Sequence, residues 1–191
     1  MKLVFATNNK NKIKEIKSLI NNSLELLDLE DIKCNEDIPE TSCTIAGNAL
    51  QKAKYVFDNY GYNCFSDDTG LEIESLNNEP GIYSARYAGE EKSAEANMNK
   101  VLTKLTNNIN RKAHFKTVIA LIIEGKETLF EGIVKGEITE SKSGSKGFGY
   151  DPIFQPEGYE ITFSEMSLEE KNKISHRGKA VQKLIKHLTS L

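Results

Sequence analysis

Four groups of polar side chains have the composition of a site for a metal ion and a nucleotide. The first follows an expected strand and precedes an expected helix, and it consists of Thr7, Asn8, Asn9, Lys10, Asn11 and Lys12. Free backbone N–H groups and the helix dipole favour an anion at such a position. Lysines there cost about 0.3 to 1 kcal/mol each unless an anion is bound. The run lacks the P-loop pattern, and taken alone it fits a polar turn with an asparagine cap better.

The second group is cationic and lies near the C-terminus. It contains Lys171, Lys173, His176, Arg177 and Lys179, which we expect at the start of the final helix. Helix starts usually favour acidic residues, so this excess of positive charge indicates a bound anion. An arginine fork can hold a phosphate or a purine carbonyl through two hydrogen bonds. A run of solvated surface charge is the alternative interpretation.

The third group is acidic and comprises Glu40, Asp67 and Asp68, with both aspartates in an expected turn at a strand end. Adjacent carboxylates can bind a hard cation and leave one carboxylate to activate water. Mg²⁺ suits this set because it needs few carboxylates and completes its shell with water and phosphate oxygens. A turn whose aspartates cap backbone N–H groups is the alternative.

The fourth group is a glycine-rich aromatic loop over residues 144–152. Glycines on both sides of Phe148 let a flat ligand approach, so Phe148 or Tyr150 can stack on a base while Asp151 accepts from ring N–H groups. Alternatively, the aromatic side chains belong to the core. Elsewhere, Lys52 shares a helix face with Asn48 and can reach a phosphate, although an exposed lysine is the default.

The elements that position these groups alternate between strands and helices. Hydrophobic periodicity predicts strands over 3–6, 24–29, 63–66, 71–75, 114–124 and 127–138, and helices over about 13–20, 44–60, 93–106 and 175–188. A turn at Gly125 and Lys126 joins the two longest strands as a hairpin, which makes part of the sheet antiparallel. We expect one mixed α/β domain, 1–191, with catalytic groups on loops at strand ends.

Composition narrows the functional classes. The 25 Lys and Arg residues against 28 Asp and Glu residues give a net charge of −3, which argues against a nucleic-acid partner. The longest apolar run, 118–123, is far below the roughly 20 residues needed to span a bilayer, and no secretory signal is recognised. Three cysteines without a Cys-x-x-Cys pair favour a reducing cytoplasm, and three scattered histidines argue against a histidine metal cage.

Seven motifs, taken in order, resemble the inosine triphosphatase family over nearly the whole chain. They are Thr7-x-Asn9-x-x-Lys12, Glu40-Thr41, Asn48-Ala49-x-x-Lys52-Ala53, Asp67-Asp68-Thr69-Gly70-Leu71, Pro80-Gly81-Ile82-Tyr83-Ser84-Ala85-Arg86-Tyr87, Gly147-Phe148-Gly149-Tyr150-Asp151-Pro152, and Glu170-Lys171-Asn172 with Ser175-His176-Arg177-Gly178. Each motif is weak by itself, but their common order is specific. The family commonly has Glu before the Asn-Ala pair, where this chain has Gly47.

The resemblance implies Mg²⁺-dependent hydrolysis of ITP, dITP and XTP to the monophosphate and pyrophosphate. It implies an elongated two-lobed α/β fold, with a mixed twisted sheet, helices around it and a cleft between the lobes, in a homodimer. The implied roles are phosphate binding by residues 7–12, Lys52 and Lys171, a further substrate contact from Thr69, metal binding by Glu40 and Asp68, water activation by Asp68 with Asp67 beside it, and purine binding by Phe148, Gly149, Tyr150, Asp151, His176 and Arg177.

Base choice is expected to depend on purine position 6. Inosine and xanthosine carry an acceptor there and adenine a donor, so donors from His176 or Arg177 would be left unpaired by ATP at about 1 to 3 kcal/mol each.

Three alternatives stay open: a pyrophosphatase for other modified nucleotides, a non-catalytic nucleotide sensor that the change at Gly47 would fit, and an RNA-binding module, which the acidic net charge disfavours.

Overall fold

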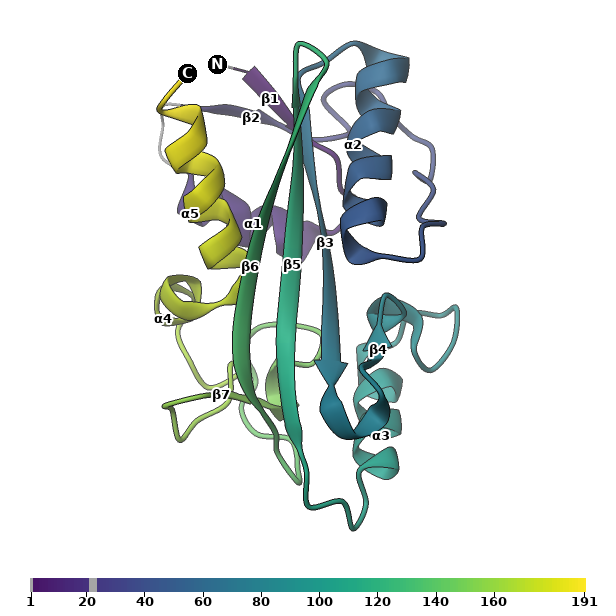
Figure 1. Cartoon of the computed structure of the whole chain (residues 1–191), viewed down its shortest axis with the longest axis vertical. Coiled ribbons are helices and arrows are strands. Elements are labelled where there is room, and N and C mark those ends of the chain that lie inside the picture. Colours follow the sequence, from purple (N-terminus) through teal and green to yellow (C-terminus); the bar gives the residue numbers. More distant parts are fainter. Residues whose placement is uncertain (1, 21–23) are drawn as a thin grey trace. The chain divides into compact units, whose positions relative to one another are not determined.

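A mixed sheet with helices packed against it organises the chain, as shown by a computed structural model that describes residues 2–20 and 24–191 (Figure 1). Within these ranges the strands are hydrogen-bonded in the order β2-β1-β3-β5-β6-β7, and β4 pairs with β3. Strand β1 pairs in parallel with β2 and β3, whereas β4 on β3 and β7 on β6 are antiparallel. The expected mixed α/β fold is therefore confirmed.

Seven strands and five α-helices make up this fold within the described ranges. The strands are β1 (Lys2–Phe5), β2 (Glu25–Leu27), β3 (Cys64–Ile73), β4 (Glu79–Gly81), β5 (Lys112–Ile123), β6 (Lys126–Ile138) and β7 (Phe154–Pro156). The helices are α1 (Lys10–Leu19), α2 (Ile45–Tyr60), α3 (Ala94–Lys104), α4 (Leu168–Ile174) and α5 (His176–Leu188). None of the helices in the described part of the chain is long and apolar enough to cross a membrane.

The chain separates into two compact units that interleave in sequence. Unit 1 comprises Met1–Asp68, Thr117–Gly132 and Arg177–Leu191, and unit 2 comprises Thr69–Lys116 and Ile133–His176. Strands β3, β5 and β6 each contribute residues to both units. The expectation of one functional domain over 1–191 stays a prediction.

In unit 1, helices cover both faces of the sheet. Phe65 of β3 stacks on Phe5 of β1 at 4.7 Å between ring centroids, and it shares a buried cluster with Ile16 of α1 and Leu184 of α5. Because successive strand residues point to opposite faces, Cys64 lies on the other side of the sheet from Phe65. There its thiol donates to the carbonyl oxygen of Ala53, within α2. Helices α1 and α5 thus pack on one face and α2 on the other.

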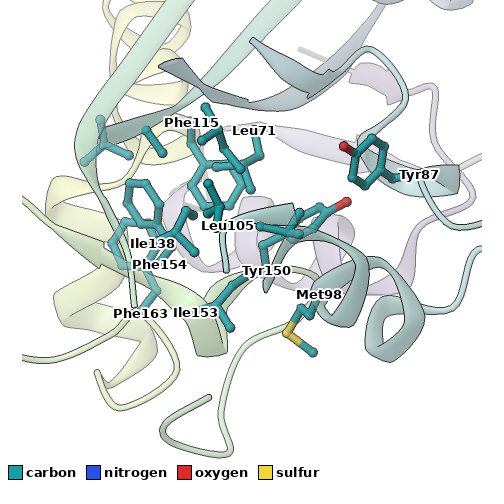
Figure 2. Packing of buried hydrophobic residues seen from close by; sticks show 14 of the residues in the cluster. Leu71, Tyr87, Met98, Leu105, Phe115, Ile138, Tyr150, Ile153, Phe154 and Phe163 are labelled. Atoms are coloured by element: carbon teal, nitrogen blue, oxygen red, sulfur yellow. The ribbon is translucent and has the colours of Figure 1, made fainter. Parts of the chain in front are cut away.

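Unit 2 is built around a separate aromatic core. Figure 2 shows Phe115, Phe154 and Phe163 among its side chains, with ring centroids 4.7 to 6.3 Å apart. Leu71 and Leu105 belong to the same buried cluster and contribute from β3 and from the end of α3. Ile138, which precedes the glycine-rich aromatic loop, and Ile153, which follows it, both belong to this core.

Local sequence signals explain where several elements begin and end. Thr44 caps α2 by accepting from the N–H of Gly47, and Gly61 ends the helix in the left-handed conformation with φ of 71°. Ser93 caps α3 in the same way. The hairpin between β5 and β6 turns at Glu124 and Gly125, both with positive φ, one residue earlier than expected.

Three expectations about local structure are wrong. Asp67 and Asp68 do not lie in a turn at a strand end, because one continuous strand, β3, runs through them. The cationic group is not one helix start: Lys171 and Lys173 lie in the last turn of α4, where the helix dipole favours cations, and α5 begins afterwards at His176. Helix α1 already starts at Lys10, so the second half of the 7–12 run is helical.

Two further differences from the expected structure concern strands of only three residues. The expected strand over 24–29 is limited to β2, Glu25–Leu27, because only three of its residues pair with β1. Strands β4 and β7 were not expected, since each has only three residues and contains a proline. A run of three residues is too short to show the alternating hydrophobic pattern of a strand.

Candidate functional site

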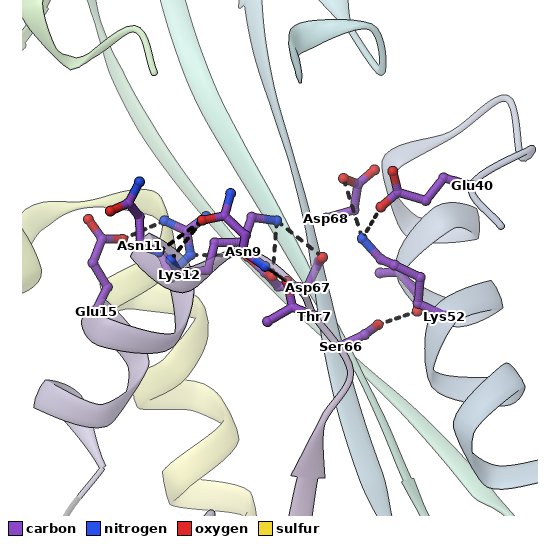
Figure 3. A network of polar contacts seen from close by, with 12 residues as sticks. Thr7, Asn9, Asn11, Lys12, Glu15, Glu40, Lys52, Ser66, Asp67 and Asp68 are labelled. Atoms are coloured by element: carbon purple, nitrogen blue, oxygen red, sulfur yellow. Dashed lines mark hydrogen bonds and ion pairs between the residues drawn. The ribbon is translucent and has the colours of Figure 1, made fainter. Parts of the chain in front are cut away.

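The two adjacent aspartates of β3 point to opposite faces of the unit 1 sheet. Asp67 follows the alternation of Phe65 toward α1 and α5, and Asp68 follows Cys64 toward α2. Figure 3 shows the result, with Asp67 beside Lys12 and Asp68 on the opposite side of the strand, beside Glu40 and Lys52. The two carboxylates therefore have different partners although they are neighbours in sequence.

On the α1 and α5 face, Asp67 is buried in a network of charged side chains. Its Oδ1 lies 3.0 Å from Nζ of Lys12, and its Oδ2 accepts from Nε of Arg177 at 3.0 Å. Nη1 of Arg177 donates to Oε2 of Glu15 at 2.5 Å. The side chains of Asp67 and Arg177 are at most 2 % exposed. Arg177 thus bridges two carboxylates, one from α1 and one from β3.

The charges in this network shift its pKa values strongly. Burial alone would raise the pKa of Asp67, but the cations of Lys12 and Arg177 outweigh it and hold that pKa well below its usual range. Burial lowers the pKa of Lys12, and the Asp67 charge offsets only part of this effect. For Arg177, the two carboxylates overcome burial and raise the pKa. Asp67 is consequently ionised at neutral pH.

On the α2 face, one ammonium group joins two carboxylates. Nζ of Lys52 donates to Oε1 of Glu40 and lies 3.9 Å from Oδ1 of Asp68. Burial acts to lower the pKa of Lys52, but Asp68 and Glu40 more than compensate, so that its pKa is raised. The Glu40 side chain is 35 % exposed and that of Asp68 14 %, whereas that of Asp67 is fully buried. The carboxylates of Glu40 and Asp68 are therefore more accessible to solvent.

The polar run over residues 7–12 contains the N-cap of α1. Oδ1 of Asn9 accepts from the N–H groups of Asn11 and Lys12 at 3.0 and 3.2 Å, and Thr7 Oγ1 accepts from the N–H of Asn9. The asparagine cap that the sequence allowed is thus present. The remaining members of the run, Asn8 and Lys10, are exposed. Phosphate binding by the run stays a prediction.

The glycine-rich loop and Lys171 come together inside unit 2. Nζ of Lys171 donates to Oδ2 of Asp151 at 2.6 Å, and the same oxygen accepts from the N–H of Phe148. Lys171 also lies 4.9 Å from the ring centroid of Phe148. Gly147, with φ of 74°, has no space for a side chain, because a Cβ would lie 2.1 Å from Oδ2 of Asp151. Lys171 is therefore grouped with the expected purine loop.

Tyr150 and His176, two further expected purine residues, contact the core of unit 2. Tyr150 is buried and donates to the carbonyl oxygen of Ser84 at 2.8 Å, and burial raises its pKa. It is a core residue, as the alternative interpretation of the loop allowed. His176 is buried and stacks on Phe115 with 4.5 Å between ring centroids. Gly149 has positive φ in the loop, and Thr69 follows Asp68 on β3.

A divalent cation fits the donor set on the α2 face of unit 1. Two carboxylates from separate segments already contact a single positive group there, the Lys52 ammonium. No cluster of three or more Asp, Glu, His or Cys side chains in the described ranges could hold a metal. The fit rests on the two carboxylates alone, since an ion such as Mg²⁺ takes one or two carboxylates and retains water or phosphate oxygens.

Sequence reasoning missed several residues of this region. Glu15 is a buried carboxylate of α1, and no local pattern marks its pairing with Arg177, which is 162 positions away. Gln51 contacts the segment that carries Glu40. Gln51 comes three residues after Asn48, and residues at this spacing share a helix face. Helical spacing could therefore have placed Gln51 beside Asn48 and Lys52.

Comparisons with known proteins find similar chains that match over nearly the full length. A dITP/XTP pyrophosphatase of Flavobacterium johnsoniae is 64 % identical over 190 residues, covering 100 % of this chain and 99 % of that protein. A dITP/XTP pyrophosphatase of Porphyromonas gingivalis is 52 % identical and covers 96 % of this chain and 95 % of its own length. The structure of the Staphylococcus aureus Ham1 protein matches with a TM-score of 0.91 and 39 % identity, over 100 % and 99 % of the two chains.

The resemblance drawn from the seven motifs is confirmed by these relatives. The Ham1 family model matches residues 3–187, which includes every motif, all of unit 2 and most of unit 1. The match therefore covers the acidic pair of β3, the glycine-rich loop and the starts of α4 and α5 together. On this basis the chain belongs to the Ham1 family.

Proposed function

We propose that this protein hydrolyses the non-standard purine triphosphates ITP, dITP and XTP to the monophosphate and pyrophosphate, which cleanses the nucleotide pool. The observation that carries the proposal is the pair of carboxylates, Glu40 and Asp68, gathered around Lys52. Full-length similarity to proteins named dITP/XTP pyrophosphatase supports the substrate class. We also propose a cytoplasmic homodimer, which the family resemblance supports.

The charge of the site supports a metal requirement. The charged cluster of unit 1 contains the cations Lys12, Lys52 and Arg177 and the carboxylates Glu15, Glu40, Asp67 and Asp68. With every group ionised it carries one net negative charge, so it attracts a polyphosphate poorly without an added cation. Glu40 and Asp68 would hold Mg²⁺, which supplies Lewis-acid stabilisation of charge on phosphate oxygens.

The residues of unit 1 can perform the hydrolytic step. Water attacks the α-phosphorus, its oxygen forms the new P–O bond, the bond to the bridging oxygen breaks, and pyrophosphate leaves. Asp68 orients this water and accepts its proton, because its carboxylate is near solvent whereas that of Asp67 is enclosed by Lys12 and Arg177. Lys12 and Lys52 stabilise the charge that develops on the phosphates.

Purine recognition is proposed for the loop of unit 2. Phe148 would stack on the base, Lys171 beside its ring would be one donor for an acceptor at position 6, and the buried His176 would be another. The earlier predictions of phosphate binding by Lys171 and base binding by Arg177 stay open. Their contacts with Asp151 and with two unit 1 carboxylates, respectively, favour other roles.

A substrate panel tests the proposal. Purified protein with Mg²⁺ is incubated with ITP, XTP, dITP, GTP and ATP, and pyrophosphate is measured against orthophosphate. We expect pyrophosphate from the first three and little from ATP. Release of orthophosphate alone would refute the reaction. Turnover of other modified bases only would favour the related pyrophosphatase, and binding without pyrophosphate release would favour the nucleotide sensor.

A further inference from the structure

The segment that carries Glu40 has no regular backbone pairing of its own. Residues 34–44 form neither helix nor strand, and Glu40 lies four residues before the cap of α2. A carboxylate on such a segment needs other contacts to keep its position. The contact between Glu40 and the buried Lys52 is one such contact, but it involves the same carboxylate that would bind a metal.

Gln51 supplies a second contact, made to the residue next to Glu40. Its Oε1 accepts from the backbone N–H of Thr41 at 2.9 Å, and its Nε2 donates to Oγ1 of Thr41 at 2.9 Å. Two parallel hydrogen bonds from one planar amide fix both the position and the rotation of Thr41. The peptide group that links Thr41 to Glu40 is therefore held directly by the helix.

Asn48 repeats this arrangement one residue further on. Its Oδ1 accepts from the N–H of Ser42 at 2.9 Å, and its side chain is buried. Ser42 sits so close to α2 that a Cβ at Gly47 would lie 1.9 Å from its Oγ. Asn48 and Gln51 thus bind consecutive backbone N–H groups from one face of α2, the face that also carries Lys52.

We propose that Gln51 and Asn48 are positioning residues for the metal-binding carboxylate of Glu40. This inference depends on the proposed function, since it takes Glu40 as a metal ligand. A divalent cation at Glu40 competes with the Lys52 ammonium for the same carboxylate. The backbone contacts at residues 41 and 42 do not involve that carboxylate, so they keep Glu40 in place when its contact with Lys52 is exchanged for one with the metal.

The central test removes the amide of Gln51 while keeping its bulk. In Gln51→Leu both bonds to Thr41 are lost, whereas Gln51→Glu keeps an acceptor for the N–H of Thr41 and for its hydroxyl proton. We expect Gln51→Leu to bind Mn²⁺, the probe ion, about tenfold more weakly in electron paramagnetic resonance titrations, and Gln51→Glu to bind at least as tightly as the parent. Thr41→Val, which removes only the side-chain acceptor, should fall between.

Hydrogen exchange provides a readout that is independent of the metal and of turnover. Without Mn²⁺, the amides of Thr41 and Ser42 should exchange faster in Gln51→Leu, while the core of α2 stays protected. Asn59→Leu is the matched control, since Asn59 is on the same helix and its side chain donates to the carbonyl oxygen of Tyr55 within that helix. It should change neither readout.

The outcomes separate this inference from the proposed function. If Glu40→Gln weakens Mn²⁺ binding strongly while Gln51→Leu binds within twofold of the parent, Gln51 has no positioning role and only this inference fails. If Mn²⁺ binding is unchanged in Glu40→Gln, the metal assignment fails and the inference with it. Equal melting temperatures for Gln51→Leu and the parent would show that the loss is not a failure to fold.

Discussion

Replacing Arg177 by Met should strongly destabilise the protein. The guanidinium contacts Asp67 and Glu15, and all three side chains are at most 6 % exposed. Met keeps much of the side-chain volume but leaves two carboxylates buried without this cation. Removing one member of a buried ion pair costs about 3 to 5 kcal/mol, which is a large part of the roughly 5 to 15 kcal/mol that stabilises a typical domain.

The assay is urea unfolding at neutral pH of Arg177→Met, of Glu15→Gln and of the double variant. Because Glu15→Gln removes one of the two charges that Arg177 compensates, the double variant should be more stable than the sum of the single losses predicts. A coupling of about 1 to 3 kcal/mol is expected for groups in one network. Additive losses, or a loss below about 1 kcal/mol for Arg177→Met, would refute the bridging role.

Three further predictions concern catalysis, pH and packing. Asp68→Asn should lower pyrophosphate release from ITP by about 10² to 10⁴ while calorimetry still detects nucleotide binding; near-normal turnover would exclude its role as base. Because burial lowers the pKa of Lys12, its charge is lost below the ordinary value of 10.5 as pH rises. The KM for ITP should therefore increase with pH already below 10.5, and Lys12→Arg should delay the increase; identical profiles for the two proteins would contradict it. Gly47→Ala should cost about 1 to 3 kcal/mol in urea unfolding because its Cβ collides with Ser42, and Ser42→Gly in the same chain should recover part of the loss.

Elements with strong local signals could be predicted from the sequence. Thr44 and Gly61 bracket α2 as expected, because a capping hydroxyl and a left-handed glycine act over a single turn. The hairpin of β5 and β6 is similarly local. The seven ordered motifs identified the family, which no single motif could do.

The path of β3 through the acidic pair could not be predicted from local preference. Asp, Asp, Thr and Gly in sequence are typical of a turn. In the structure, Asp67 pairs with Arg177, which is 110 positions away, and with Lys12, 55 positions away. Such distant contacts and the neighbouring strands outweigh the turn preference, because β structure depends more on tertiary context than helix does. The split of the cationic group between α4 and α5 is a different case, because the capping box of Ser167 and Glu170 that starts α4 is a local signal and was readable from the sequence.

The register of β3 is what gives the two aspartates different chemistry. Val4 is paired with Cys64, and Phe5 with Phe65, which sets Asp67 toward α1 and α5 and Asp68 toward α2. A shift by one residue would exchange the two faces, placing Asp68 among the buried cations and Asp67 near the α2 carboxylate. The stacked aromatic pair of β1 and β3 opposes that shift, because it would turn Phe65 out of its cluster with α1 and α5. The apolar packing of unit 1 therefore determines which carboxylate stabilises the fold and which one is available to a metal and to water.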